Sequence, residues 1–151
     1  MITSRYATLH DIDLILDEAE KGNAETRWNF TFDRDAGHDY VRTLIESETS
    51  EILIVERDGV PAGGAIVSLS YEFFDRPFAI VSKFWIIREH RRGDASHVLI
   101  ETIQDWAYAH GCSHLFAAAN GRLNKVEQML FCRLMKKHGL EDVGPVFALK
   151  L

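Results

Sequence analysis

The sequence REHRRGDASH, residues 88–97, connects the end of a hydrophobic segment to the start of an amphipathic one. In the amphipathic segment, residues 95–110, apolar side chains recur three and four positions apart, which predicts a helix that Gly111 ends. Three arginines therefore crowd a helix N-terminus, where the macrodipole already places positive charge. This arrangement is unfavourable unless an anion binds, and Gly93 permits close backbone approach. The segment therefore predicts a site for a phosphate or pyrophosphate.

A simpler alternative is that Asp94 caps the helix while the arginines lie in solvent. A single cap does not require three arginines, so we favour the anion site. In the alternative the Asp94 side chain accepts a capping hydrogen bond from a backbone N–H, whereas an anion site requires the first backbone N–H groups of the helix to be available.

Length and composition indicate one domain spanning residues 1–151. Hydrophobic residues make up 46% of the chain and charged residues 26%, which excludes wholesale disorder. No apolar run approaches the roughly 20 residues of a membrane span, and the first residues lack the features of a secretory signal. With only Cys112 and Cys132, a disulfide framework is not expected, so we predict a reducing, cytoplasmic location.

The order of the expected elements predicts an α+β fold. Strands are expected at about 2–6, 51–57, 60–71, 78–87, 114–119 and 142–151. Helices are expected at about 11–21, 38–48, 95–110 and 124–138. The irregular stretch 22–37 carries Trp28, Phe30 and Phe32, which is compatible with a loop over a groove or with simple packing. This order places helices on both faces of a mixed sheet.

Several short motifs in this order resemble the GNAT acyl-CoA N-acyltransferases. They are the loop after the fourth strand, the helix end Trp106-Ala107 with Gly111-Cys112, the opening Arg5-x-Ala7-Thr8-x-x-Asp11, and the hairpin Asp58-Gly59-x-x-Ala62-Gly63. The resemblance spans nearly the whole chain and implies a GNAT-like, mainly antiparallel sheet and an acetyl-CoA donor. The family's Arg/Gln-x-x-Gly-x-Gly/Ala motif aligns with its first residue at Arg91, or at His90 after a one-residue shift.

The resemblance also implies which residues hold the donor. Its pyrophosphate is expected on the backbone of residues 92–97 and on the side chains of Arg91 or Arg92. The pantetheine arm is expected along the strand that precedes the loop. Asn120 and Asn124 are either cofactor contacts or simply turn and N-cap residues. The complete set implied is Trp85, Ile86, Ile87, Arg91, Arg92, Gly93, Asp94, Ala95, Ser96, His97, Asn120 and Asn124.

In the Arg91 register, Asp94 and Ser96 stand where the family prefers glycine, and two further departures concern the catalytic positions. Met135 stands where many members have a tyrosine that protonates the departing thiolate, and Lys83 stands roughly where a glutamate base often lies. The catalytic acid and base are therefore left unassigned. A GNAT fold that binds or regulates without catalysis, acting through protein–protein contacts, is the alternative function.

Charge is distributed unevenly along the chain. Residues 1–75 contain 16 Asp and Glu against 6 Lys and Arg, whereas residues 76–151 contain 7 against 11. In the inferred fold the acidic half, including Asp33, Asp35 and Asp39, borders the acceptor side. We therefore predict a cationic amine acceptor, either a lysine or N-terminus of a protein or a small polyamine-like molecule. A merely solubilising acidic surface is the alternative.

Other classes of site are not predicted. His110 and His114 flank a helix-breaking glycine and so do not form a convincing metal clip. The aromatic residues between 71 and 85 are not interleaved with basic ones, so a nucleic-acid platform is not expected. No membrane partner is predicted. A homodimer is one candidate assembly. The third functional hypothesis is a protein–protein interaction domain that uses the acidic half as its contact surface.

Overall fold

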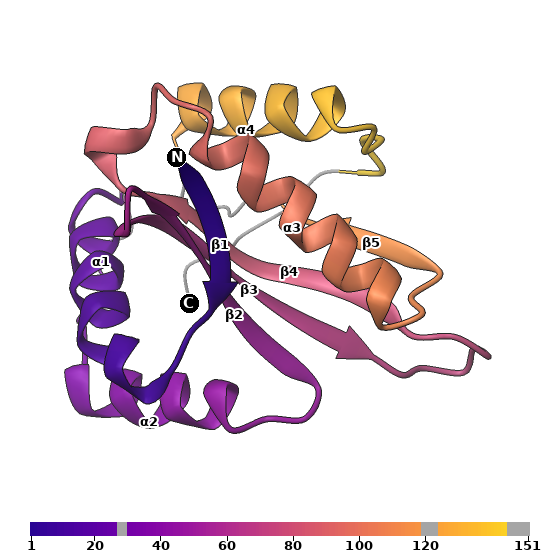
Figure 1. The fold of residues 1–151 in the computed structure, drawn as a ribbon, viewed down its shortest axis with the longest axis horizontal. Helices are drawn as coiled ribbons and strands as arrows, with labels where there is room; N and C mark the ends of the chain where they lie inside the picture. Colours follow the sequence, from indigo (N-terminus) through magenta and orange to yellow (C-terminus); the bar gives the residue numbers. More distant parts are fainter. Residues whose placement is uncertain (27–29, 119–123, 145–151) are drawn as a thin grey trace.

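A five-stranded sheet organises the molecule (Figure 1), and the computed structural model describes residues 1–26, 30–118 and 124–144. The strands are β1 (Ile2–Tyr6), β2 (Ser50–Arg57), β3 (Val60–Ser70), β4 (Phe78–Ile86) and β5 (His114–Ala117). They lie in the order β1-β2-β3-β4-β5. The first four are antiparallel, and β5 runs parallel to β4. This arrangement confirms the predicted mixed, mainly antiparallel sheet.

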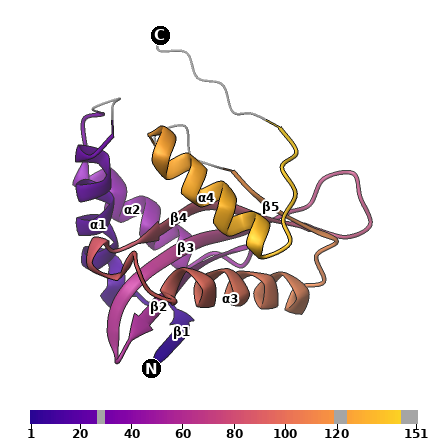
Figure 2. The same cartoon turned by 90° about the horizontal axis from the view of Figure 1, so that it is seen from above.

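Helices cover both faces of the sheet, as predicted. They are α1 (Ile12–Ala24), α2 (Arg34–Ile45), α3 (Ala95–Ala109) and α4 (Lys125–Lys137), with short 3-10 turns η1 (Leu9–Asp11) and η2 (Arg88–His90). Figure 2 shows α1 and α2 on one side of the central strands and α3 on the other. None of the described helices is long and apolar enough to cross a membrane.

Strand β2 is hydrophobic on both faces because it lies between these two helical layers. Ile52 and Ile54 belong to the core beneath α1 and α2, whereas Leu53 and Val55 belong to the core beneath α3. All four are at most 1% exposed. Since successive side chains of a strand point to opposite faces, one apolar run supplies both cores.

The structure corrects several predicted boundaries. Helix α1 extends to Ala24, and α2 begins at Arg34 rather than at about residue 38, because the Asp33 side chain accepts a capping hydrogen bond from the Ala36 N–H at 3.0 Å. The stretch 22–37 is therefore helical at both ends. Strand β5 ends at Ala117, and residues 142–144 lie outside any strand. Trp28 and the rest of the predicted closing strand fall outside the described residues.

A partly buried ion pair joins β1 to the start of α1. The Arg5 guanidinium donates to both carboxylate oxygens of Asp11, at 2.8 and 2.9 Å, and to Glu56 at 2.7 Å. Asp11 also accepts the Thr8 N–H at 2.7 Å, so its carboxylate supports the turn that leads into α1. The Arg5 hydrogen bonds lower the pKa of Asp11 from 3.8 to about 2.

Replacing Asp11 by Asn is expected to lower the free energy of unfolding by about 2 kcal/mol at neutral pH. This cost is smaller than for a fully buried pair, since Arg5 is partly exposed. A carboxyl with a depressed pKa contributes its stability above 3.8 and loses it as the pH falls through about 2. Urea unfolding should therefore show a difference between wild type and variant that shrinks in this acid range. A difference independent of pH would contradict this explanation.

Candidate donor-binding site

Strands β4 and β5 separate halfway along β4. Their pairing begins at Phe78 with His114 and stops at Val81 with Ala117. On its other edge β4 stays paired with β3, but the register shifts so that Ser82 is an extra, bulged residue. Beyond the bulge, β4 continues to Ile86 without a partner on its β5 side among the described residues. The unpaired backbone groups there are available to a ligand that contains amide bonds.

The side chains of this part of β4 are held by packing. Trp85 faces the core beneath α1 and α2 and lies over Gly64, where any Cβ atom would overlap the indole ring. Phe84 and Ile86 pack on the α3 side instead. The Ile87 N–H donates to the Ala62 carbonyl on β3 at 2.9 Å. Backbone groups of successive strand residues point to opposite edges, so Ile86 directs its N–H toward the β5 side, whereas Trp85 and Ile87 direct theirs toward β3.

The predicted anion loop lies directly after this strand. It passes through η2, where the Gly93 N–H donates to the His90 carbonyl at 3.3 Å, and then enters α3. Asp94 occupies the N-cap position, but its side chain makes no capping hydrogen bond, so capping does not explain this residue. Within the described part of the chain, the backbone N–H groups of Asp94, Ala95 and Ser96 donate to no protein acceptor. Ala95 is fully buried, so the N–H groups of Asp94 and Ser96 form the available N-terminus that an anion site requires.

The arginines around this loop have different surroundings. Arg91 donates to the Ile86 carbonyl at 3.2 Å and lies 3.4 Å from the Glu25 carboxylate, so it fixes the loop to β4 and to the end of α1. Arg92 is exposed and makes no ion pair with any described residue. Arg57, from the end of β2, lies against Gly93 so closely that a Cβ atom there would overlap its guanidinium. Sequence reasoning missed Arg57 because no motif links it to a loop so distant along the chain.

Two further predicted residues, His97 and Asn124, lie beside α4 and at its start. The His97 Nδ1 atom is 2.8 Å from Nε2 of His138, which places its imidazole between α3 and the end of α4. The Asn124 side chain caps α4 by accepting the Glu127 N–H at 2.9 Å, which gives it the N-cap role. Asn120 lies outside the described residues.

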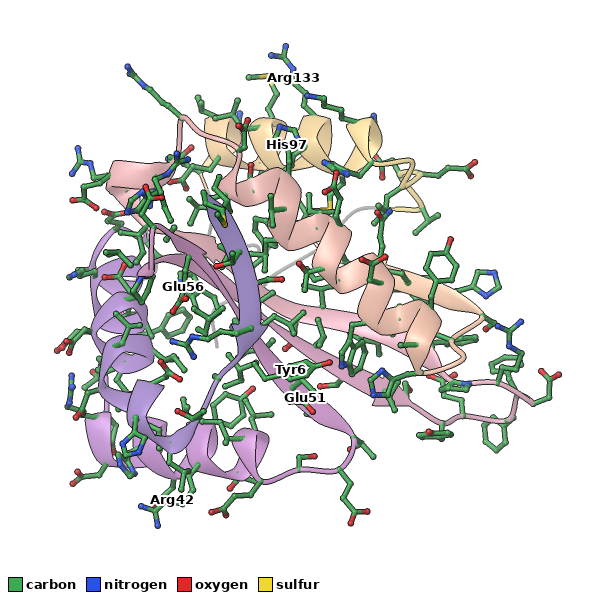
Figure 3. The ribbon with its side chains drawn as sticks, viewed as in Figure 1. Tyr6, Arg42, Glu51, Glu56, His97 and Arg133 are labelled. Atoms are coloured by element: carbon green, nitrogen blue, oxygen red, sulfur yellow. The ribbon has the colours of Figure 1, made fainter. Side chains whose placement is uncertain are left out.

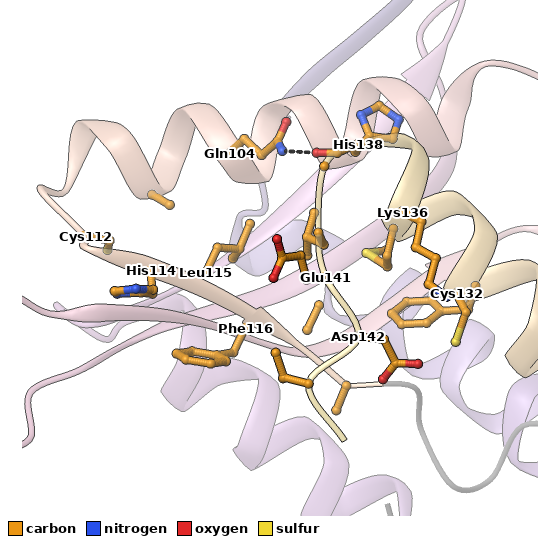
Figure 4. Close-up of a pocket in the computed structure, with 18 of the residues that line it drawn as sticks. Gln104, Cys112, His114, Leu115, Phe116, Cys132, Lys136, His138, Glu141 and Asp142 are labelled. Atoms are coloured by element: carbon orange, nitrogen blue, oxygen red, sulfur yellow. Dashed lines mark hydrogen bonds between the residues drawn. The ribbon is translucent and has the colours of Figure 1, made fainter. Parts of the chain in front are cut away.

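A cavity of about 890 Å³ lies between α3, β5, α4 and the segment after α4 (Figure 4). Its walls include Leu115, Phe131 and Met135, and none of residues 91–97 lines it. Met135 is only 8% exposed, so the residue at the family's tyrosine position is a buried thioether. A thioether cannot donate a proton.

Lys83, at the predicted base position, pairs with Ile66 and so lies on the α1–α2 side of β4. No group of three His, Cys, Asp or Glu side chains suited to a metal ion occurs among the described residues. With no acid, base or metal site assigned among the described residues, the features that can bind a donor are the unpaired edge of β4 and the uncapped start of α3.

Three solved structures share this fold. An aminoglycoside N-acetyltransferase, AAC(6')-Iy in complex with CoA, has a TM-score of 0.78 at 14% identity, covering 100% of this chain and 95% of that chain. A ribosomal-protein-alanine N-acetyltransferase from Brucella melitensis biovar Abortus 2308 has a TM-score of 0.75 at 15% identity, covering 99% of both chains. A transcriptional regulator from Bacillus halodurans C-125 has a TM-score of 0.80 at 12% identity, covering 100% of both.

At these identities the structural likenesses show the fold alone. No curated protein matches the sequence of this chain. The model of the acetyltransferase (GNAT) family, however, matches residues 16–132, which is most of the chain. The chain therefore belongs to the GNAT acetyltransferase family, whose acetyl donor is acetyl-CoA.

Proposed function

We propose that the donor binds across the start of α3 and along the unpaired edge of β4, and that the enzyme acetylates a cationic amine. In this arrangement the pyrophosphate accepts hydrogen bonds from the free N–H groups of Asp94 and Ser96, on either side of the buried Ala95. The exposed Arg92, two residues before Asp94, supplies a positive charge that forms no ion pair with any described residue. Arg91 acts chiefly by holding the loop against Ile86, and Arg57 adds positive charge behind Gly93.

The length of the unpaired edge supports this arrangement. From Ile87, the residue after β4, back to the bulge at Ser82, the chain spans about 17 Å at roughly 3.3 Å per residue. That span is of the order of an extended pantetheine arm, so the thioester reaches the point where β4 and β5 separate. The observation that carries the proposal is this continuity of an uncapped helix N-terminus with an unpaired strand edge.

Acetyl transfer from a thioester to an amine requires few catalytic side chains. The acceptor amine attacks the thioester carbonyl carbon, the C–N bond forms, the C–S bond breaks, and the amine loses a proton while the thiolate gains one. Backbone N–H groups of β4 can stabilise the developing oxyanion, and fixed placement of donor and amine supplies most of the acceleration. Because Met135 cannot donate a proton, we expect the thiolate to take its proton from solvent.

The charges on α1 and α2 support a cationic acceptor. Arg34 neutralises part of this surface by bonding to Asp17 at 2.9 Å and to Asp13 at 3.2 Å. Asp33 is used as the helix cap. Asp35 and Asp39 are exposed and make no side-chain ion pair with any described residue. They are the acidic groups of α2 that can attract a positively charged amine.

Thiol release from acetyl-CoA is expected to be fastest with cationic amines and to slow as salt is added. Raising the ionic strength from about 0.01 M to about 0.15 M shortens the Debye length from about 30 Å to about 8 Å. We therefore expect kcat/KM for a diamine or a lysine peptide to fall several-fold, while a neutral amine is unaffected. Equal rates for cationic, neutral and anionic amines at both salt concentrations would leave the acidic surface without a role in acceptor choice.

A further inference from the structure

Two histidines join the proposed phosphate end of the site to α4. His97 is in the first turn of α3 and His138 is the C-cap residue of α4. Their rings lie 5.0 Å apart, with Nδ1 of His97 2.8 Å from Nε2 of His138. Two turns further along α3, the Gln104 side chain donates to the His138 carbonyl at 3.0 Å (Figure 4). Figure 3 shows His97 between α3 and α4.

The bond between the two rings limits how many protons they can hold. One ring nitrogen must donate and the other must accept, so the pair keeps its hydrogen bond when neutral or singly protonated and loses it when both rings are charged. Burial and the nearby charges of His97 and Lys137 lower the pKa of His138 below 6.5, against the opposing effect of Glu101. The hydrogen bond therefore joins α3 to α4 as long as at least one of the two rings is neutral.

We propose that His138 is a positioning residue of the donor site, acting through its hydrogen bond to His97. This inference rests on the proposed function. The bond holds the end of α4 against the first turn of α3 and fixes the His97 imidazole next to Asp94, Ala95 and Ser96. When both rings are protonated the bond is lost, the two helices separate at this point, and the phosphate end of the site loosens.

The test compares CoA binding by calorimetry at about pH 8 and about pH 5.5 in wild type, His138→Gln, His138→Phe and His10→Gln. Glutamine keeps a donor and an acceptor at the position of Nε2 but does not titrate, whereas phenylalanine keeps only the ring. His10→Gln is the matched control, because His10 is exposed on η1. Titration of CoA itself affects all four proteins equally and cancels in the comparison.

Between about pH 8 and about pH 5.5, the CoA affinity of the wild type and of His10→Gln is expected to fall by about ten times the change seen in His138→Gln. His138→Gln should match the wild type at the higher pH and change less than about twofold. His138→Phe should bind about tenfold more weakly than wild type at about pH 8. A wild-type pH dependence in His138→Gln, or wild-type affinity in His138→Phe, would overturn the inference.

A second measurement separates this inference from the proposed function. If no variant binds CoA, the proposed function fails, but the histidine pair is still testable in the free protein. Long-range nitrogen NMR of the imidazoles should show that the pKa of His138 is below 6.5. Amide exchange of α4, corrected for intrinsic rates, should accelerate at acid pH in wild type and not in His138→Gln. Identical exchange in both proteins would refute the role of the pair.

Discussion

Replacing Arg91 and Arg92 together by Glu is expected to weaken CoA binding by about 100-fold or more. The change places two carboxylates beside the free N–H groups where the pyrophosphate is proposed to bind, and it removes the bond from Arg91 to the Ile86 carbonyl. Thermal unfolding should change little, because both side chains are exposed and lie outside the cores.

Calorimetry with CoA is the measurement, and Arg42→Glu is the matched control. Arg42 is exposed on α2, away from the loop, and carries the same type of charge reversal (Figure 3). The single variant Arg92→Glu separates direct attraction from loop positioning, since Arg92 makes no protein ion pair within the described residues. Wild-type affinity in the double variant would show that the donor binds elsewhere.

Replacing Gly64 by Ala is expected to destabilise the fold by about 3 kcal/mol or to prevent folding. A Cβ atom at this position would overlap the Trp85 ring and would lie 2.7 Å from the Leu53 carbonyl oxygen. The tryptophan could move, but the β2 backbone cannot, because Leu53 is fully buried in the core.

Urea unfolding of Gly64→Ala and Gly22→Ala gives a matched comparison. Gly22 lies in α1 with open space around its Cα atom, so alanine there should stabilise the protein by about 0.5 to 1 kcal/mol. Similar stabilities for the two variants would mean that β3 and β4 are not packed as closely as described.

Much of the fold was predictable because its signals are local. The spacing of apolar residues predicted α3, and the Asp58-Gly59 pair predicted the hairpin between β2 and β3. The start of α2 was missed because residues 22–37 lack a regular period and Gly37 is a poor helix former, although Asp33 was an available N-cap signal. The first residue of a helix depends on such a single capping side chain, which the spacing of apolar residues does not reveal.

The placement of the arginine-rich loop was predictable, whereas the contacts around it were not. The arginine-rich loop pointed to the start of α3, but the approach of Arg57 to Gly93 and the bond between His97 and His138 join segments far apart along the chain. The bulge at Ser82 has no sequence signature either, since it depends on the register of β4 against β3. These features follow from tertiary packing, which a local pattern does not contain.

Titration of isotope-labelled protein with CoA, followed through its backbone amide resonances, tests the donor site most directly. We predict the largest changes in chemical shift at Asp94, Ala95 and Ser96. Further changes are expected along residues 83–87, which cover the second half of β4 and the residue after it. Shifts confined instead to the walls of the cavity between α3, β5 and α4, such as Leu115 and Phe131, would contradict the proposed site.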